Sequence, residues 1–182
     1  MRRLLSAALI FLAVGPVPGT VMRFPESDLT ERVAARPLVF APATTGTMRF
    51  VRGWQLVSPH SRFGGFSALA RTGPDRFQLM GDNGYSTRLT LDRRGSVSDV
   101  RIRALPTPDG RPQRKSMVDT EAMFVDPASG KSWVALEVIN QIWRLDADHS
   151  QIESRRALPE PRWPRNRGPE AMTRLADGRM VV

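Results

Sequence analysis

The sequence contains no cysteine and only two histidines, His60 and His149. Without cysteine the chain has no disulfide bond, no thiolate metal site and no cysteine nucleophile. The two histidines are isolated in the sequence, and we expect both to be exposed. A histidine-based metal site or a catalytic triad is therefore not expected. Any bound metal must be held by oxygen ligands.

Lysine is also scarce, although the chain is strongly basic. The 27 basic residues outnumber the 18 acidic ones, the formal net charge is +9, and every basic residue except Lys115 and Lys131 is arginine. The arginines are scattered rather than gathered in a stripe, so the pattern does not favour nucleic acid binding. It favours solubility, attraction to anionic envelope surfaces and steering of anionic substrates.

Only one long hydrophobic run is present, and it lies at the N-terminus. Arg2 and Arg3 precede an apolar run from Leu4 to Val14, and glycine and proline dominate residues 15–19. This pattern is typical of a secretory signal peptide, here residues 1–19, and predicts a periplasmic or secreted protein. A run of about eleven residues is too short to span a bilayer, which takes about 20. An uncleaved N-terminal anchor is the alternative, and no integral membrane segment is expected after cleavage.

The rest of the chain has the pattern of an all-β protein. Short apolar runs recur between clusters of glycine, proline, aspartate and asparagine, and no stretch keeps a helical period for long. Residues 20–60 are proline-rich and irregular, and we expect one or two strands there. Residues 61–182 carry the regular pattern and form the expected main domain.

An internal repeat sets the fold prediction for this domain. Three similar segments, each followed by a glycine-containing turn and a second apolar strand, are Ser67–Ala70, Glu121–Phe124 and Glu170–Thr173. Their spacing of about 50 residues is that of one four-stranded propeller blade. In the middle unit the four strands are expected at 122–125, 132–136, 142–146 and 152–158. The prediction is a partial β-propeller of about three blades.

A closed propeller ring needs at least about four blades. We therefore expect the natural protein to continue beyond Val182. The alternative fold is a β-sandwich in which the strand spacings coincide by chance. A sandwich gives no reason for carboxylates to recur at the equivalent position of two hairpins. A propeller does, because every first strand starts at the central channel.

Acidic residues recur in these repeats. Glu121 and Glu170 stand at the start of a first strand in two units, and Asp82 and Glu137 close the second strands of the first two units. An antiparallel hairpin returns its end beside its start, so the four acids should cluster at one mouth of the channel. Neighbouring carboxylates repel one another unless a cation neutralises them. We predict a calcium site formed by these acids and Asn83, because Ca²⁺ prefers oxygen ligands.

Glu121 and Glu170 are the candidate catalytic pair, because a carboxylate flanked by apolar strand residues is costly to bury without a partner. A cation there would polarise a phosphate or carbonyl oxygen for attack by water, and one acid would serve as general base. The candidate residues for binding a small anionic or ester substrate are Arg165, Asn166 and Arg167. The segment around Ser67 lacks the nucleophile-elbow pattern, so a serine nucleophile is not expected.

Four motifs follow one another in this order: Phe63–Leu69, Asp119–Met123, Trp133–Glu137 leading to Ile142–Arg144, and Asn166–Met172. In order and spacing they resemble the esterase-like phytase family, from about Phe63 to Val182. The resemblance implies an exported bacterial propeller of six blades. It also implies acids at the channel mouth, which here are Asp82, Glu121, Glu137 and Glu170.

The sequence thus favours an exported hydrolase that acts on an ester, phosphoester or lactone with a metal, calcium, at the channel mouth. The alternative is a non-catalytic propeller that binds a ligand or a partner of the cell envelope, since propellers host many unrelated functions. A third reading is a gene fragment without a stable fold.

Overall fold

The computed structural model describes residues 27–40, 44–111, 114–159, 163 and 167–182. The predicted signal peptide lies outside these residues, as do Arg165 and Asn166. Within the described part the chain consists of strands and turns, with one short helix, α2 (Lys115–Val118). The all-β prediction is confirmed. None of the helices in this part is long and apolar enough to cross a membrane.

The first complete sheet consists of four consecutive strands: β5 (Phe66–Arg71), β6 (Arg76–Gly81), β7 (Tyr85–Leu91) and β8 (Val97–Ala104). Each strand pairs antiparallel with the next, so their order in the sheet is their order in the sequence. Tight turns join them, and Gly84 and Gly95 supply the positive φ that two of these turns require. This is the meander of one propeller blade.

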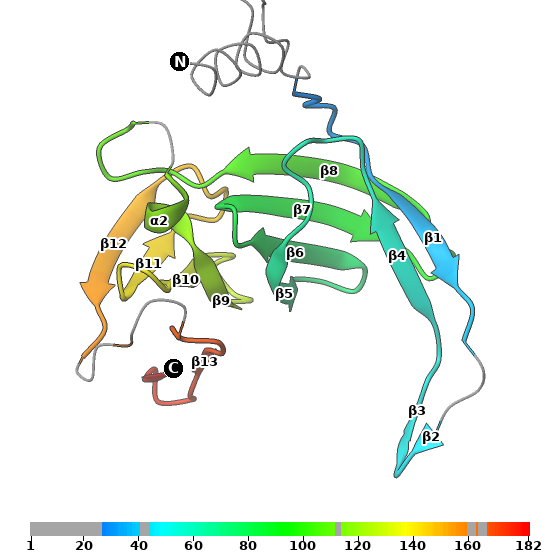
Figure 1. Ribbon diagram of the computed structural model, residues 1–182. Coiled ribbons are helices and arrows are strands. Elements are labelled where there is room, and N and C mark those ends of the chain that lie inside the picture. Colours follow the sequence, from blue (N-terminus) through cyan, green and yellow to red (C-terminus); the bar gives the residue numbers. More distant parts are fainter. Residues whose placement is uncertain (1–26, 41–43, 112–113, 160–162, 164–166) are drawn as a thin grey trace, which may run out of the picture.

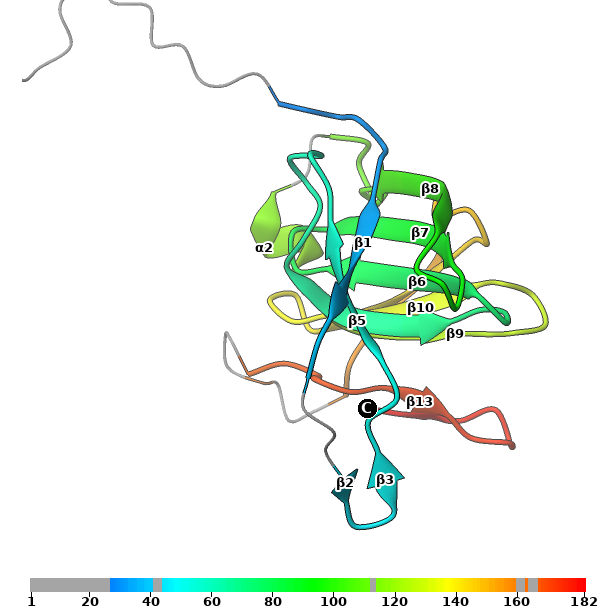
Figure 2. The same ribbon diagram turned by 90° about the vertical axis from the view of Figure 1, so that its right-hand side faces the viewer.

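The second sheet repeats this arrangement with β9 (Thr120–Val125), β10 (Ser132–Leu136), β11 (Gln141–Leu145) and β12 (Ile152–Ala157). The strands begin and end within two residues of the bounds expected from the sequence. The first strands of the two sheets lie side by side, β5 next to β9. Figures 1 and 2 show the two sheets arranged as neighbouring blades.

The two blades pack through the side chains that alternate along their strands. Met80 of β6 lies in one buried cluster with Val134, Leu136 and Trp143 of the second blade. Trp143 is fully buried. The apolar runs that predicted the strands thus also contribute the residues of this buried cluster.

The opposite face of the first blade is covered by an N-terminal hairpin of β1 (Ala34–Leu38) and β4 (Gly53–Val57). Leu79 and Leu89 of the blade share a second buried cluster with Val33 and pack against Leu56. Two-residue strands, β2 (Thr44–Thr45) and β3 (Met48–Arg49), extend this hairpin (Figure 1). Between residues 27 and 60 the structure thus has four strands, where the sequence predicted one or two.

A last hairpin, β13 (Thr173–Arg174) and β14 (Met180–Val181), corresponds to the start of a third blade, and β13 lies next to β9. The described chain therefore contains two complete blades and the beginning of a third, which is the predicted partial β-propeller. Each of the two complete blades is built from four consecutive strands. A sandwich would exchange strands between its sheets through Greek-key connections.

Candidate functional site

The first strands of both blades begin with the same irregularity. In β9, Glu121 is skipped in the pairing with β10, and in β5, Ser67 is skipped in the pairing with β6. Such a β-bulge turns the side chain of the extra residue away from the regular alternation. Glu121 and Ser67 therefore hold equivalent positions at the start of two neighbouring first strands.

The end of the second strand is fixed to the same place in both blades. The N–H of Asp82 donates to the carbonyl of Gly65 at 2.8 Å, and the N–H of Glu137 donates to the carbonyl of Asp119 at 2.9 Å. Asp82 and Glu137 thus occupy equivalent positions, each beside the start of its own first strand.

Three acids of the second blade come together there. One carboxylate oxygen each of Asp119, Glu121 and Glu137 lies within 4.8 Å of the other two. Glu137 is only 6% exposed, and Asp119 and Glu121 are partly buried. We call these three residues the carboxylate cluster. Its ligand atoms are all carboxylate oxygens, which suits a hard cation such as Ca²⁺ or Mg²⁺.

The electrostatics of the cluster show that its charges are poorly compensated. Burial raises the pKa of Glu121, and so do the negative charges of Asp119, Glu137, Glu170 and Asp82. A raised pKa means that the ionised form is disfavoured, because desolvation and like charges both oppose it. A cation bound at this place would relieve both effects.

Lys115 is the cation that the described structure places beside these acids. Its Nζ lies 3.1 Å from Oδ2 of Asp82, with the lysine side chain 66% exposed. Burial raises the pKa of Asp119, whereas the charge of Lys115 opposes this rise. One exposed ammonium group compensates only part of the negative charge, because solvent screens it.

Glu137 is held by the next unit of the repeat. Its Oε1 accepts a hydrogen bond of 2.9 Å from the N–H of Gly168. A Cβ at Gly168 would overlap the side chain of Glu137, so only glycine allows this approach. Gly65 lies against Asp82 in the same way. In both motifs, a glycine thus lets the backbone approach an acidic side chain closely: Gly168 approaches Glu137, and Gly65 approaches Asp82.

The acids predicted from the sequence divide into two groups. Glu121 and Glu137 belong to the carboxylate cluster, whereas Asp82 and Glu170 flank it. The charges of Asp82 and Glu170 act on Glu121, but neither residue supplies an oxygen to the group of three. Glu170 is exposed.

The predicted polar residues lie differently. Oδ1 of Asn83 accepts a hydrogen bond from the N–H of Tyr85, and its Nδ2 donates to the carbonyl of Arg62, both at 3.1 Å. Asn83 is thus engaged in its own turn and is not part of the carboxylate cluster. Of the predicted substrate-binding residues, Arg167 is exposed, and two lie outside the described residues, Arg165 and Asn166.

Sequence reasoning missed two residues of this region, Asp119 and Lys115. Asp119 is only two residues from the candidate Glu121, but the bulge at Glu121 interrupts the regular alternation there, so spacing alone did not place the two side chains together. Lys115 carries a weaker signal, namely that it is one of only two lysines. Its proximity to Asp82, 33 residues away, is set by the fold.

The expectation that both histidines are exposed is wrong. His60 is 6% exposed and His149 is 1% exposed. His149, in the turn after β11, inserts between the blades, with Nε2 at 2.8 Å from Oγ of Ser132 and at 2.6 Å from Nε2 of Gln78. Ser132 is fully buried, so a substrate has no access to this Ser–His contact. Burial lowers the pKa of His149 to about 4.

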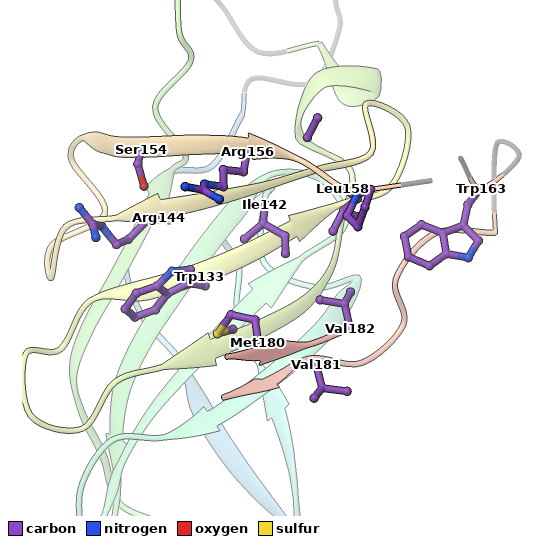
Figure 3. A pocket seen from close by; sticks show the side chains of 12 residues that line it. Trp133, Ile142, Arg144, Ser154, Arg156, Leu158, Trp163, Met180, Val181 and Val182 are labelled. Atoms are coloured by element: carbon purple, nitrogen blue, oxygen red, sulfur yellow. The ribbon is translucent and has the colours of Figure 1, made fainter. Parts of the chain in front are cut away.

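A large cavity of about 1040 Å³ lies away from the acids. It separates the second blade from the β13–β14 hairpin, with Trp133, Arg144 and Met180 among its lining residues (Figure 3). Trp133 and Arg144 form a cross-strand pair, equivalent to Gln78 and Arg88 in the first blade. The second blade packs over that face of the first blade, so this cavity belongs to the surface between blades.

Two blades in sequence, with a carboxylate cluster at the start of the first strands, define a β-propeller with a candidate metal site. The family model of phytase-like proteins, described as "Esterase-like activity of phytase", matches residues 61–182. The chain belongs to this family, as the motifs of the sequence indicated. No curated protein matches the chain.

Several solved structures are similar to parts of the chain. Hydrazine synthase of Kuenenia stuttgartiensis has a TM-score of 0.42 and 14% identity, covering 63% of this chain and 27% of that one. The Pan2 WD40 domain of Neurospora crassa has a TM-score of 0.31 and 13% identity, covering 60% and 41%. Apo AztD of Citrobacter koseri has a TM-score of 0.31 and 14% identity, covering 70% and 45%. The chain spans less than half of each of these structures.

Proposed function

We propose that this protein is an exported hydrolase that cleaves an ester, phosphoester or lactone bond at the channel mouth with the help of a calcium ion. The observation that carries the proposal is the carboxylate cluster of Asp119, Glu121 and Glu137. Membership of the phytase-like family supports the hydrolase class. The N-terminal sequence pattern supports export to the periplasm or the medium.

The residues of the cluster fit a calcium ion. They offer carboxylate oxygens only, and they lie close enough together to share one ion. Burial, followed by the negative charges of neighbouring acids, raises the pKa of Glu121 and of Asp119, so a cation at this place would favour their ionised forms. When bound, the ion would polarise a carbonyl or phosphoryl oxygen of the substrate.

Glu170 and Asp82, which flank the cluster, have roles other than binding the ion. Glu170 is exposed, and its charge acts on Glu121, so it lies close to the site without supplying an oxygen to the group of three. We assign it the role of general base, which takes a proton from the attacking water. Asp82 holds the ammonium group of Lys115 at the rim of the site.

The test compares Glu121→Gln and Glu170→Gln with the wild type on p-nitrophenyl esters and p-nitrophenyl phosphate, with calcium and with a chelator. We expect turnover that requires calcium. Glu170→Gln should lose about a hundredfold or more, the range of one acid–base group, and Glu121→Gln should lose turnover because it removes a charged ligand of the ion. Glu153→Gln is the matched control, because Glu153 pairs with Lys131 and Arg144 and is not part of the carboxylate cluster.

Circular dichroism must show that the variants keep the β-structure of the wild type. Normal turnover by the folded Glu121→Gln and Glu170→Gln variants would remove the catalytic assignment. Calcium binding without turnover of any substrate would instead favour the alternative, a propeller that binds a ligand without catalysis.

A further inference from the structure

A second hollow lies beside the carboxylate cluster, on the flank of the first blade. It has a volume of about 900 Å³, within the range of small-molecule sites. Its wall is formed by the start of β7, the segment that follows β8, and α2. Its charged lining residues are Arg62, Arg111 and Lys115, and no acidic residue of the described chain lines it. We call it the cationic hollow.

The positive charges of this hollow are only partly compensated. The guanidinium group of Arg62 lies over the ring of Tyr85, 5.7 Å from its centroid, and has no carboxylate partner within the described residues. Arg111 pairs with Asp109 at 3.7 Å, where both side chains are strongly exposed. Such an exposed pair contributes little and opens readily. The hollow therefore presents guanidinium groups that are available to an anion.

Hydrogen bonds hold the backbone around Arg62 in place. The amide of Asn83 binds the carbonyl of Arg62 and the N–H of Tyr85, which fixes these two residues relative to each other. The N–H of Arg62 donates to Nδ1 of the buried His60 at 3.1 Å. These hydrogen bonds fix the backbone from which the side chains of Arg62 and Tyr85 extend into the hollow.

Lys115 connects the hollow with the carboxylate cluster. It lines the hollow, and its Nζ forms the ion pair with Asp82, whose charge in turn acts on Glu121. Besides Asp82, the charges of Asp119 and Glu121 also act on the ammonium group of Lys115 and raise its pKa, so this side chain borders both the hollow and the cluster.

We infer that the cationic hollow binds a second anionic group of the substrate, a carboxylate or a phosphate, while the bond to be cleaved lies at the carboxylate cluster. This inference rests on the proposed function and narrows it to esters that carry a further anionic group. Arginine suits this task, because its planar guanidinium group binds both oxygens of a carboxylate or phosphate.

The first test measures binding without catalysis. Inorganic phosphate and succinate are titrated by calorimetry into the full chain after calcium has been removed with a resin-bound chelator, so that no free chelator competes as an anion. We expect the wild type to bind at least one of them, and Arg62→Gln and Arg111→Gln to bind it about tenfold more weakly, a change of about 1.4 kcal/mol. Arg179→Gln, which removes an exposed charge in the β13–β14 turn, should bind like the wild type. The preferred anion distinguishes carboxylate from phosphate.

The second test measures turnover of two esters with the same leaving group, neutral p-nitrophenyl butyrate and anionic mono-p-nitrophenyl succinate. We expect Arg62→Gln to raise KM about tenfold for the anionic ester and to leave KM for the neutral ester unchanged. Absence of anion binding in the wild type, or equal KM changes for both esters, would overturn the inference. Anion binding that depends on Arg62 without turnover of any ester would support the hollow as an anion site and contradict the proposed hydrolase activity.

Discussion

Acid should weaken the contact between the two blades through His149. This residue is 1% exposed and sits against Ser132 and Gln78. Burial lowers its pKa, and the nearby charge of Arg88 lowers it further, whereas Asp146 and Asp148 act in the opposite direction. The folded protein therefore holds this imidazole in its neutral form.

The size of the effect follows from the change in pKa between the unfolded and the folded chain. The ordinary value is 6.5 and the folded value is about 4, which corresponds to about 3 kcal/mol. Between these two values the unfolded chain binds a proton that the folded chain does not bind. Stability is thus fully present above pH 6.5, falls as the pH is lowered to about 4, and the loss levels off below that pH.

The assay is urea unfolding at a series of pH values from 7.5 to about 4, for the wild type and for His149→Asn. Asparagine tolerates the positive φ of 55° at this position and does not titrate. The difference between the two proteins cancels the titration of the acids. We expect the wild type to lose up to about 3 kcal/mol relative to the variant on acidification. Parallel pH profiles would refute this account of the contact.

Two further predictions concern the site and the core. Gly168→Ala should lower calcium affinity by about tenfold or more, because the new Cβ would displace Glu137; calorimetry of the folded variant measures this, and unchanged affinity would contradict it. Leu145→Ala should destabilise the chain by about 2–5 kcal/mol, since Leu145 is fully buried in the core shared by the blades. Leu69→Ala is the matched control at 66% exposure and should change the unfolding free energy by less than about 0.5 kcal/mol. Similar costs for both leucine variants would contradict the assigned packing.

Local patterns predicted the blades well because each blade is built from consecutive hairpins. The strands of the second blade are short apolar runs, such as Ala122–Val125 and Trp133–Leu136, and they are separated by turns of polar and turn-forming residues, such as the one closed by Gly130. Both signals lie within a few residues of the strands that they define. The N-terminal hairpin was harder, since β1 contains Pro37 and pairs with a strand some 20 residues further on.

The site was predicted only in part, for a physical reason. The sequence predicted that Glu121 and Glu137 lie together, because they stand at the start and the end of one hairpin, and a hairpin returns its end beside its start. Asp119 joins them through the bulge at the start of β9, which depends on the register with β10. His149 was misjudged because its partner Gln78 lies 71 residues away in another blade. Contacts between blades leave no local trace in the sequence.

Calcium binding to the full chain tests the carboxylate cluster most directly. Calorimetric titration of the wild type and of Glu121→Gln, with Glu153→Gln beside them, compares their dissociation constants at neutral pH. We predict that Glu153→Gln binds calcium like the wild type and that Glu121→Gln binds about tenfold or more weakly, since it loses one charged ligand. Equal calcium affinity in all three proteins, or no binding to any of them, would contradict the cluster as a metal site.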